Sequence, residues 1–342
     1  MPARNGNYDL VKDWIRENGT MPNGDKMPKR KMARMIYKEH GLNFTDEENV
    51  RIIIQRVTGK GGKNDEVRVD ADLKDDLPAN YNPYGLPESH TEEKIIFKLP
   101  VGCTRVLYLP DPHIPYHDVD AMTVAINTGK EKKINCIILP GDVIDMHQGS
   151  KYESNPKKRS IKEEFDAACE FLQILRDTFP GVPIYWIEGN HDKRWRDFLL
   201  RKCREIWDDP YYHLEDRLKL ADKNITLFNE KVEFWAGDLR VTHGHLIFNT
   251  GFGAPIYPAK SMWDKTGVQY VIGHVHTVTT YKKVRKGAPN QMCYTLGCLS
   301  EIDPDYNPIV NRYEHGFGYQ DIYPDGTFDF YNYRIENGRA KL

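Results

Sequence analysis

Five short apolar runs in this sequence each end in aspartate, histidine or asparagine, and this arrangement constrains the fold more than any other feature. The runs lie in "RVLYLPD", "NCIILPGD", "WIEGNHD", "RVTHGH" and "YVIGHVH". Helical patterns follow the first three runs, over residues 119–132, over residues 160–178 and up to about residue 206. Apolar strands that alternate with helices predict an α/β sheet that is at least partly parallel.

The polar residues that end these runs should meet in one cleft, because ligands gather at the carboxyl ends of the strands in such sheets. Imidazole together with carboxylate is a ligand set for transition metals. A single pair such as "GHVH" is weak support for a metal, but five separate strand ends of this kind make coincidence a poor explanation. The sequence therefore predicts a metal site.

The motifs D-x-H, G-D-x-x-D, G-N-H-D, H-G and G-H-x-H occur in this order over about residues 104–280. As a set they resemble the five blocks of the calcineurin-like metallophosphoesterases. The resemblance implies a four-layer α/β fold, a β-sandwich flanked by helices, with a two-metal centre at the strand ends. It also implies that one ion is bound by Asp111, His113 and His276, that the other is bound by Asn190, His243 and His274, and that Asp142 bridges them.

Two divalent ions about 3.5–4 Å apart can hold both the attacking and the leaving oxygen of a phosphoryl displacement. The mixed nitrogen and oxygen ligands suit Mn, Fe, Zn, Ni or Mg, of which we expect Mn. By the same resemblance His191 is the general acid, and Asp192 beside it is expected to orient or charge the imidazole. The alternative is that His191 only hydrogen-bonds phosphate. Asp145 is expected to hold a ligand histidine by its far nitrogen.

Basic residues follow three of the motifs, within residues 151–162, 192–196 and 282–286. Such residues either track a polyanionic backbone or form solvated faces. Lys193 and Arg194, with Asn190, are the candidate substrate-binding residues. The leading hypothesis is a phosphodiesterase that acts as a nuclease on DNA or RNA. The rivals are a phosphomonoesterase for a nucleotide or phosphoprotein and an inactive scaffold on a phosphoesterase fold.

The predicted domains are a helical module over residues 1–60, a linker over 61–95 and a phosphoesterase domain over 96–342 with a β-rich C-terminal extension. Three helical patterns make up the module, and the third opens at Thr45 with a capping box to Glu48. Residues 1–64 contain 13 Lys and Arg against 8 Asp and Glu, and three short basic helices resemble a helix-turn-helix module for DNA. The alternative is a small bundle that docks on the main domain or on another protein. In the extension, Tyr313, Phe317, Tyr319 and Tyr323 are expected to pack in a terminal sheet rather than stack on bases.

Composition limits the other classes of function. Hydrophobic residues at 39%, charged residues at 29% and a net charge of −2 describe an ordinary globular chain with no overall attraction to nucleic acid or membrane. No apolar run approaches the roughly 18 residues that span a bilayer, and the N-terminus lacks a signal-peptide pattern. Six scattered cysteines favour reduced thiols and a cytoplasmic location.

Overall fold

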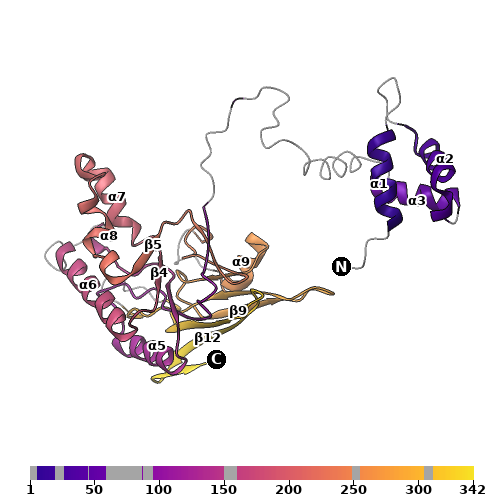
Figure 1. Ribbon diagram of the computed structural model, residues 1–342. Helices are drawn as coiled ribbons and strands as arrows, with labels where there is room; N and C mark the ends of the chain where they lie inside the picture. The colour runs from indigo at the N-terminus through magenta and orange to yellow at the C-terminus, as the bar shows by residue number, and fades with distance from the viewer. Residues whose placement is uncertain are drawn as a thin grey trace. The chain divides into compact units, whose positions relative to one another are not determined.

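The computed structural model describes residues 6–19, 27–44, 46–58, 87, 95–149, 160–248, 255–303 and 311–342. The chain divides into two compact units, residues 1–91 and 92–342. Figure 1 draws the elements of both units.

Among its described residues the first unit has three α-helices, α1 (Gly6–Asn18), α2 (Lys29–His40) and α3 (Glu47–Thr58), with the short 3-10 helix η1 (Gly41–Asn43) after α2. Apolar residues at helical spacing bury one face of each helix against the others, among them Trp14, Ile36 and Ile54. The opposite face of α2 is basic and exposed. Thr45 and almost all of the predicted linker 61–95 lie outside the described residues.

The second unit is built on two β-sheets. The seven-stranded sheet has the order β13-β12-β11-β2-β3-β4-β5, and the six-stranded sheet has the order β1-β6-β7-β8-β10-β9. In the first sheet β2, β3, β4 and β5 are parallel, and β11 joins β2 antiparallel. The strands of the first sheet are β2 (Arg105–Tyr108), β3 (Cys136–Leu139), β4 (Ile184–Ile187), β5 (Ile225–Phe228), β11 (Gly316–Ile322), β12 (Phe328–Glu336) and β13 (Arg339–Lys341). Those of the second are β1 (Ile96–Lys98), β6 (Glu233–Ala236), β7 (Leu239–Val241), β8 (Tyr270–Ile272), β9 (Thr279–Lys283) and β10 (Gln291–Thr295).

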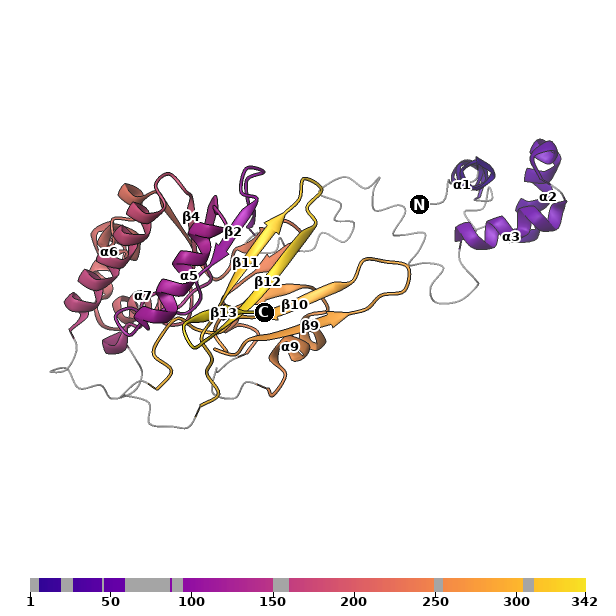
Figure 2. The ribbon, with the colours of Figure 1, turned by 90° about the horizontal axis from the view of Figure 1, so that it is seen from below.

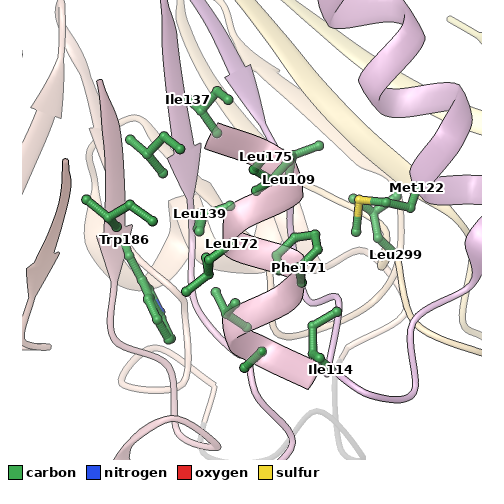
Figure 3. Packing of buried hydrophobic residues seen from close by; sticks show 14 of the residues in the cluster. Leu109, Ile114, Met122, Ile137, Leu139, Phe171, Leu172, Leu175, Trp186 and Leu299 are labelled. Carbon is green, nitrogen blue, oxygen red and sulfur yellow. The ribbon is translucent and has the colours of Figure 1, made fainter. Parts of the chain in front are cut away.

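Helices complete a four-layer arrangement. α5 (Val119–Glu131) and α6 (Ile161–Thr178) cover the outer face of the seven-stranded sheet, and α9 (Pro258–Thr266) packs on the six-stranded sheet (Figures 1 and 2). The strands alternate to serve two cores. In β2, Val106 and Tyr108 face the second sheet while Leu107 faces the helices. In β4, Trp186 faces the helices, where it packs beside Leu139, Leu172 and their neighbours (Figure 3).

The predicted fold class, an α/β sandwich of two sheets with flanking helices, is confirmed. α6 begins at a capping box in which Ser160 accepts from the Glu163 N–H. The C-terminal hairpin β11–β12 turns at residues 324–326, whose Pro-Asp-Gly sequence is typical of such turns, and it buries Phe317 and Tyr319. Shorter elements connect the larger ones: η3 (His147–Gly149), α7 (Lys193–Lys202), η4 (Arg204–Ile206), η5 (Pro210–Tyr212), α8 (Leu214–Arg217) and η6 (Ala221–Lys223). None of the helices in the described part of the chain is long and apolar enough to cross a membrane.

Candidate metal centre

Five loops carry the predicted site residues, and each begins where a central strand ends. β2, β3 and β4 are parallel neighbours, so the loops that follow them leave the seven-stranded sheet at one edge. β7 and β8 are parallel neighbours in the other sheet, and their loops meet the first three. The backbone N–H of His274 donates to Asp111 Oδ1 at 3.0 Å, although 163 residues separate the two in sequence.

The backbone of these loops is strained at the residues that matter. Five of the predicted metal ligands have positive φ angles, a region that L-residues other than glycine avoid at a cost of about 1–2 kcal/mol each. Such strain persists where the surrounding structure holds it, and it concentrates at functional sites. The residues are Asp111 (φ 47°), His113 (47°), Asp142 (49°), His274 (65°) and His276 (51°).

Two glycines allow the loops to approach one another. A Cβ at Gly189 would lie 2.2 Å from Asp142 Oδ1, and one at Gly273 would lie 2.0 Å from Asp111 Oδ2. No side chain larger than hydrogen fits at either position without moving a carboxylate. The glycine that opens each of the motifs G-N-H-D and G-H-x-H is therefore required by the packing of the site.

The first group of ligand atoms belongs to Asp111, His113 and His276, which are all buried. Their donor atoms lie within 4.8 Å of one another. His276 Nε2 lies 3.4 Å from Asp111 Oδ1, and the rings of His113 and His276 meet edge to face at 5.3 Å. This is the set that the sequence predicts for one ion.

The second group contains Asp142, His243 and His274, again with donor atoms within 4.8 Å of one another. His243 Nε2 lies 3.2 Å from Asp142 Oδ2 and 3.1 Å from Asn190 Oδ1. Its Nδ1 lies 2.9 Å from the carbonyl oxygen of Pro140, which can accept from Nδ1–H and leave Nε2 as the ligand atom. Asp142 also groups with His113 and His191, so it lies between the two sets.

The charges of this cluster are strongly coupled. Burial lowers the pKa of His243, but the carboxylates of Asp142, Asp111 and Asp192 together outweigh burial and raise the pKa to about 9. Burial, and then the charge of His243, lowers the pKa of His274 to about 3. Burial opposes ionisation of Asp142, yet the neighbouring histidines hold its pKa well below the usual range. A cluster that keeps a buried carboxylate ionised by protonating an adjacent imidazole is suited to exchange that proton for a cation.

The donor set fits divalent metal ions. His113 Nε2 and His276 Nδ1 are buried and have no hydrogen-bond partner among the described residues. Buried ring nitrogens without partners are costly unless something binds them. The other nitrogen of His113 lies 3.1 Å from Asp145 Oδ1, which can hold the ring with Nε2 toward the cluster. The cluster is thus consistent with a binuclear metal site.

His191 lies at the edge of this cluster and contacts Asp145 rather than Asp192. Its Nδ1 is 3.0 Å from Asp145 Oδ1 and 2.9 Å from the Asp145 carbonyl oxygen. Its Nε2 is 2.9 Å from Arg194 Nη2 and 3.9 Å from Asp142 Oδ2. Because the guanidinium is always a donor, His191 Nε2 accepts this bond and Nδ1 carries the proton.

The expectation that Asp192 orients His191 is wrong. Asp192 is buried, and its two oxygens accept from the N–H groups of Gly189 and Ile144 and from the Trp186 indole, at 2.8–3.0 Å. These bonds leave it facing away from the imidazole and tie the loop after β4 to the loop after β3. Adjacency in sequence suggested the wrong carboxylate, because the side chains of His191 and Asp192 contact different partners.

Of the basic residues predicted to bind substrate, Arg194 lies at the site and Lys193 does not. Arg194 contacts His191, whereas Lys193 forms an ion pair with Glu230, which also binds His245 at 2.8 Å. Residues 150–159, with most of the first basic run, lie outside the described part of the chain. The run at 282–286 continues β9 away from the metal cluster, and Arg285 lines a surface depression with Asp238, which precedes β7. This last run is therefore at the opposite end of β7 from His243.

One further contact of the site differs from the expectation that Tyr313 packs in a terminal sheet, because β11 begins only at Gly316. Tyr313, which lies far along the C-terminal extension, packs edge to face on His276 with the ring centroids 4.5 Å apart. The backbone N–H of Glu314 also donates to the His276 carbonyl at 2.8 Å. The extension therefore supports the last metal loop.

Comparison with known proteins places the sequence of this region in a family. The family model for calcineurin-like phosphoesterases matches residues 104–292, more than half of the chain. A sphingomyelin phosphodiesterase 1 of Caenorhabditis elegans is 34% identical over 79 residues, which is 23% of this chain and only 12% of that protein.

Two solved structures align over most of the second unit. Vacuolar protein sorting 29 of Cryptosporidium parvum aligns with a TM-score of 0.39 and 16% identity, over 70% of this chain and 94% of that one. The phosphoesterase YfcE of E. coli aligns with a TM-score of 0.32 and 14% identity, over 66% and 98%. Likeness at this level carries no argument about substrate.

Proposed function

The chain belongs to the calcineurin-like phosphoesterase family, and from that premise we propose that it is a metal-dependent hydrolase of phosphodiester bonds in DNA or RNA. The observation that supports hydrolysis is the pair of neighbouring ligand groups, of which Asp142 belongs to the second and also groups with His113 of the first. We assign Asp111, His113 and His276 to one ion, Asn190, His243 and His274 to the other, and Asp142 to both. Two divalent ions bound there, Mn by our expectation, would polarise the phosphoryl group. They would also lower the pKa of water, so that hydroxide could act as the nucleophile near neutral pH.

His191 is the proposed proton donor to the leaving oxygen. To donate, it must carry a proton on Nε2, and Asp145 at Nδ1 stabilises the imidazolium that results. Arg194 cannot then remain 2.9 Å from Nε2, because two donors would face each other. We therefore expect the guanidinium to leave His191 for a phosphate oxygen when substrate arrives, which gives Arg194 its role in substrate binding.

Nucleic acid is the proposed substrate because of the exposed face of α2. Arg30, Arg34 and Lys38 repeat at four-residue intervals on that face, and Lys31 is exposed beside them. A row of cations along a helix suits the phosphates of a duplex. Arg194 is the charged contact that the second unit adds at the centre itself. A cytoplasmic location accords with the six free cysteines and is part of the proposal.

The test is hydrolysis of labelled single- and double-stranded DNA and RNA by the Mn-loaded protein, with an Asp142→Asn variant and p-nitrophenyl phosphate in parallel. We expect cleavage of nucleic acid that the variant loses. Intact nucleic acid with rapid turnover of the monoester would replace this proposal with a phosphomonoesterase. No turnover of any ester would favour the inactive scaffold.

Binding by α2 has its own matched pair of variants. Lys38→Glu should weaken duplex binding severalfold and reduce the slope of log affinity against log salt by about 1 or more. Lys130→Glu, an equally exposed charge reversal on α5, should leave both unchanged. Equal effects of the two substitutions would show only a general response to charge.

A further inference from the structure

A cavity lies beside α7, and none of the predicted metal ligands lines it. It has a volume of about 330 Å³ and is enclosed by α7, η5, α8 and the end of β5. This volume falls within the range of sites that bind small molecules. Neither the proposed chemistry nor the proposed nucleic-acid contacts use it.

The walls of the cavity are aromatic and apolar. Trp195, Trp207 and Tyr212 line it, with Leu199 and Leu214 buried at its base. The Trp195 indole N–H donates to the Tyr212 carbonyl oxygen at 2.6 Å, which fixes one wall. Trp207 is 38% exposed, so its indole is open to whatever occupies the cavity.

The charges of the lining are predominantly negative. Asp208 and Glu215 are exposed at the cavity, and neither side chain has a hydrogen bond or ion pair among the described residues. Glu188, only 4% exposed, also lines the cavity, where Arg196 Nη2 lies 2.9 Å from its Oε2. The one arginine of the lining is thus engaged by a carboxylate, and two further carboxylates have no described partner.

We propose that this cavity binds a small organic cation, an alkyl-substituted ammonium whose charge faces Asp208 and Glu215 while its alkyl groups contact Trp207 and Tyr212. Indole and phenol rings attract cations through the negative faces of their π systems, and quaternary ammonium groups are recognised in this way. An anion would meet two unpaired carboxylates. A neutral apolar molecule of the same shape would gain the contacts with the rings but not the charge interactions.

The cavity adjoins the loop that carries His191, and the buried side chain of Asp192 on that loop also lines it. Glu188 lies two residues before Asn190, on the loop that begins at the end of β4, and its side chain points into the cavity lining. An occupant would therefore touch the loop that carries Asn190 and His191.

The test compares two ligands of equal shape by titration calorimetry on the full chain: choline, and its uncharged counterpart 3,3-dimethyl-1-butanol. We expect choline to bind at least about fivefold more tightly than the alcohol, in keeping with a desolvated cation against an aromatic ring. Trp207→Ala should remove most of that preference. Tyr323→Ala, which alters a 47% exposed ring that does not line the cavity, should leave it intact.

Two further variants locate the site. The double substitution Asp208→Asn and Glu215→Gln changes only exposed side chains, so the fold should survive, and choline affinity should fall severalfold. Asp142→Asn should leave choline binding unchanged, since Asp142 does not line the cavity. Equal affinity for choline and the alcohol, no binding of choline, loss of binding in Asp142→Asn, or full binding in Trp207→Ala would each overturn the proposal.

Discussion

Replacing Gly273 with alanine tests whether the close approach of two loops holds the metal centre together. The added Cβ would lie 2.0 Å from Asp111 Oδ2, where real contacts of this kind are no shorter than 3.0 Å. The Asp111 carboxylate or the loop after β8 must therefore move by at least about 1 Å. A misplacement of about 1 Å at a catalytic centre can cost on the order of a hundredfold in rate, about 2.7 kcal/mol of transition-state stabilisation.

The assay is kcat/KM for bis(p-nitrophenyl) phosphate with Mn, together with Mn affinity by calorimetry and the melting temperature. Gly102→Ala is the matched control, because nothing lies within 4 Å of its Cβ. We expect Gly273→Ala to lose at least about a hundredfold in kcat/KM and to bind Mn more weakly, while Gly102→Ala stays close to wild type. A Gly273→Ala enzyme within threefold of that control would refute the argument from loop packing.

Three further results are expected. Asp145→Asn removes the charged acceptor shared by His113 and His191, so kcat/KM should fall about 10–100-fold, and an unchanged value would contradict the assigned role. Burial, and then the charge of Asp142, raises the pKa of Asp192 to about 6 from the usual 3.8, so its ionisation opposes folding. Urea unfolding of the metal-free protein should therefore show wild type losing stability relative to Asp192→Asn as the pH rises from about 4 through about 6, and a constant difference would exclude this. Removing divalent ions with EDTA should lower the melting temperature and adding Mn should restore it, because a ligand of the folded state alone stabilises that state.

The sequence was sufficient for the sheet core and for the gathering of the polar residues. Apolar runs at "RVLY", "CIIL" and "IYWI" form three adjacent parallel strands, and the residues after them meet as expected. The reason is that the carboxyl ends of parallel strands lie at one edge of the sheet. The order of apolar runs along the chain therefore determines which residues become neighbours. The fold class depends on the same pattern.

Contacts between loops could not be predicted in this way. Asp145 and Asp192 both follow strands and both adjoin the site in sequence, yet only Asp145 contacts the His191 ring. The choice depends on side-chain direction in irregular backbone, which has no period to detect. The same holds for Lys193, which pairs with Glu230, while Arg194, one residue on, contacts His191.

The backbone strain of the site also has no sequence signal, and it explains why the site needs so large a scaffold. Five ligand residues with positive φ cost about 1–2 kcal/mol each, which together approach the whole stability of an ordinary domain. Loops alone could not hold that conformation. Here the loops follow buried strands of two sheets, which hold where each loop begins. The C-terminal extension adds a further support, because Tyr313 packs on His276. Loosening that support should therefore weaken metal binding before it unfolds the chain, so Tyr313→Ala is expected to lower Mn affinity more than it lowers the melting temperature of the metal-free protein.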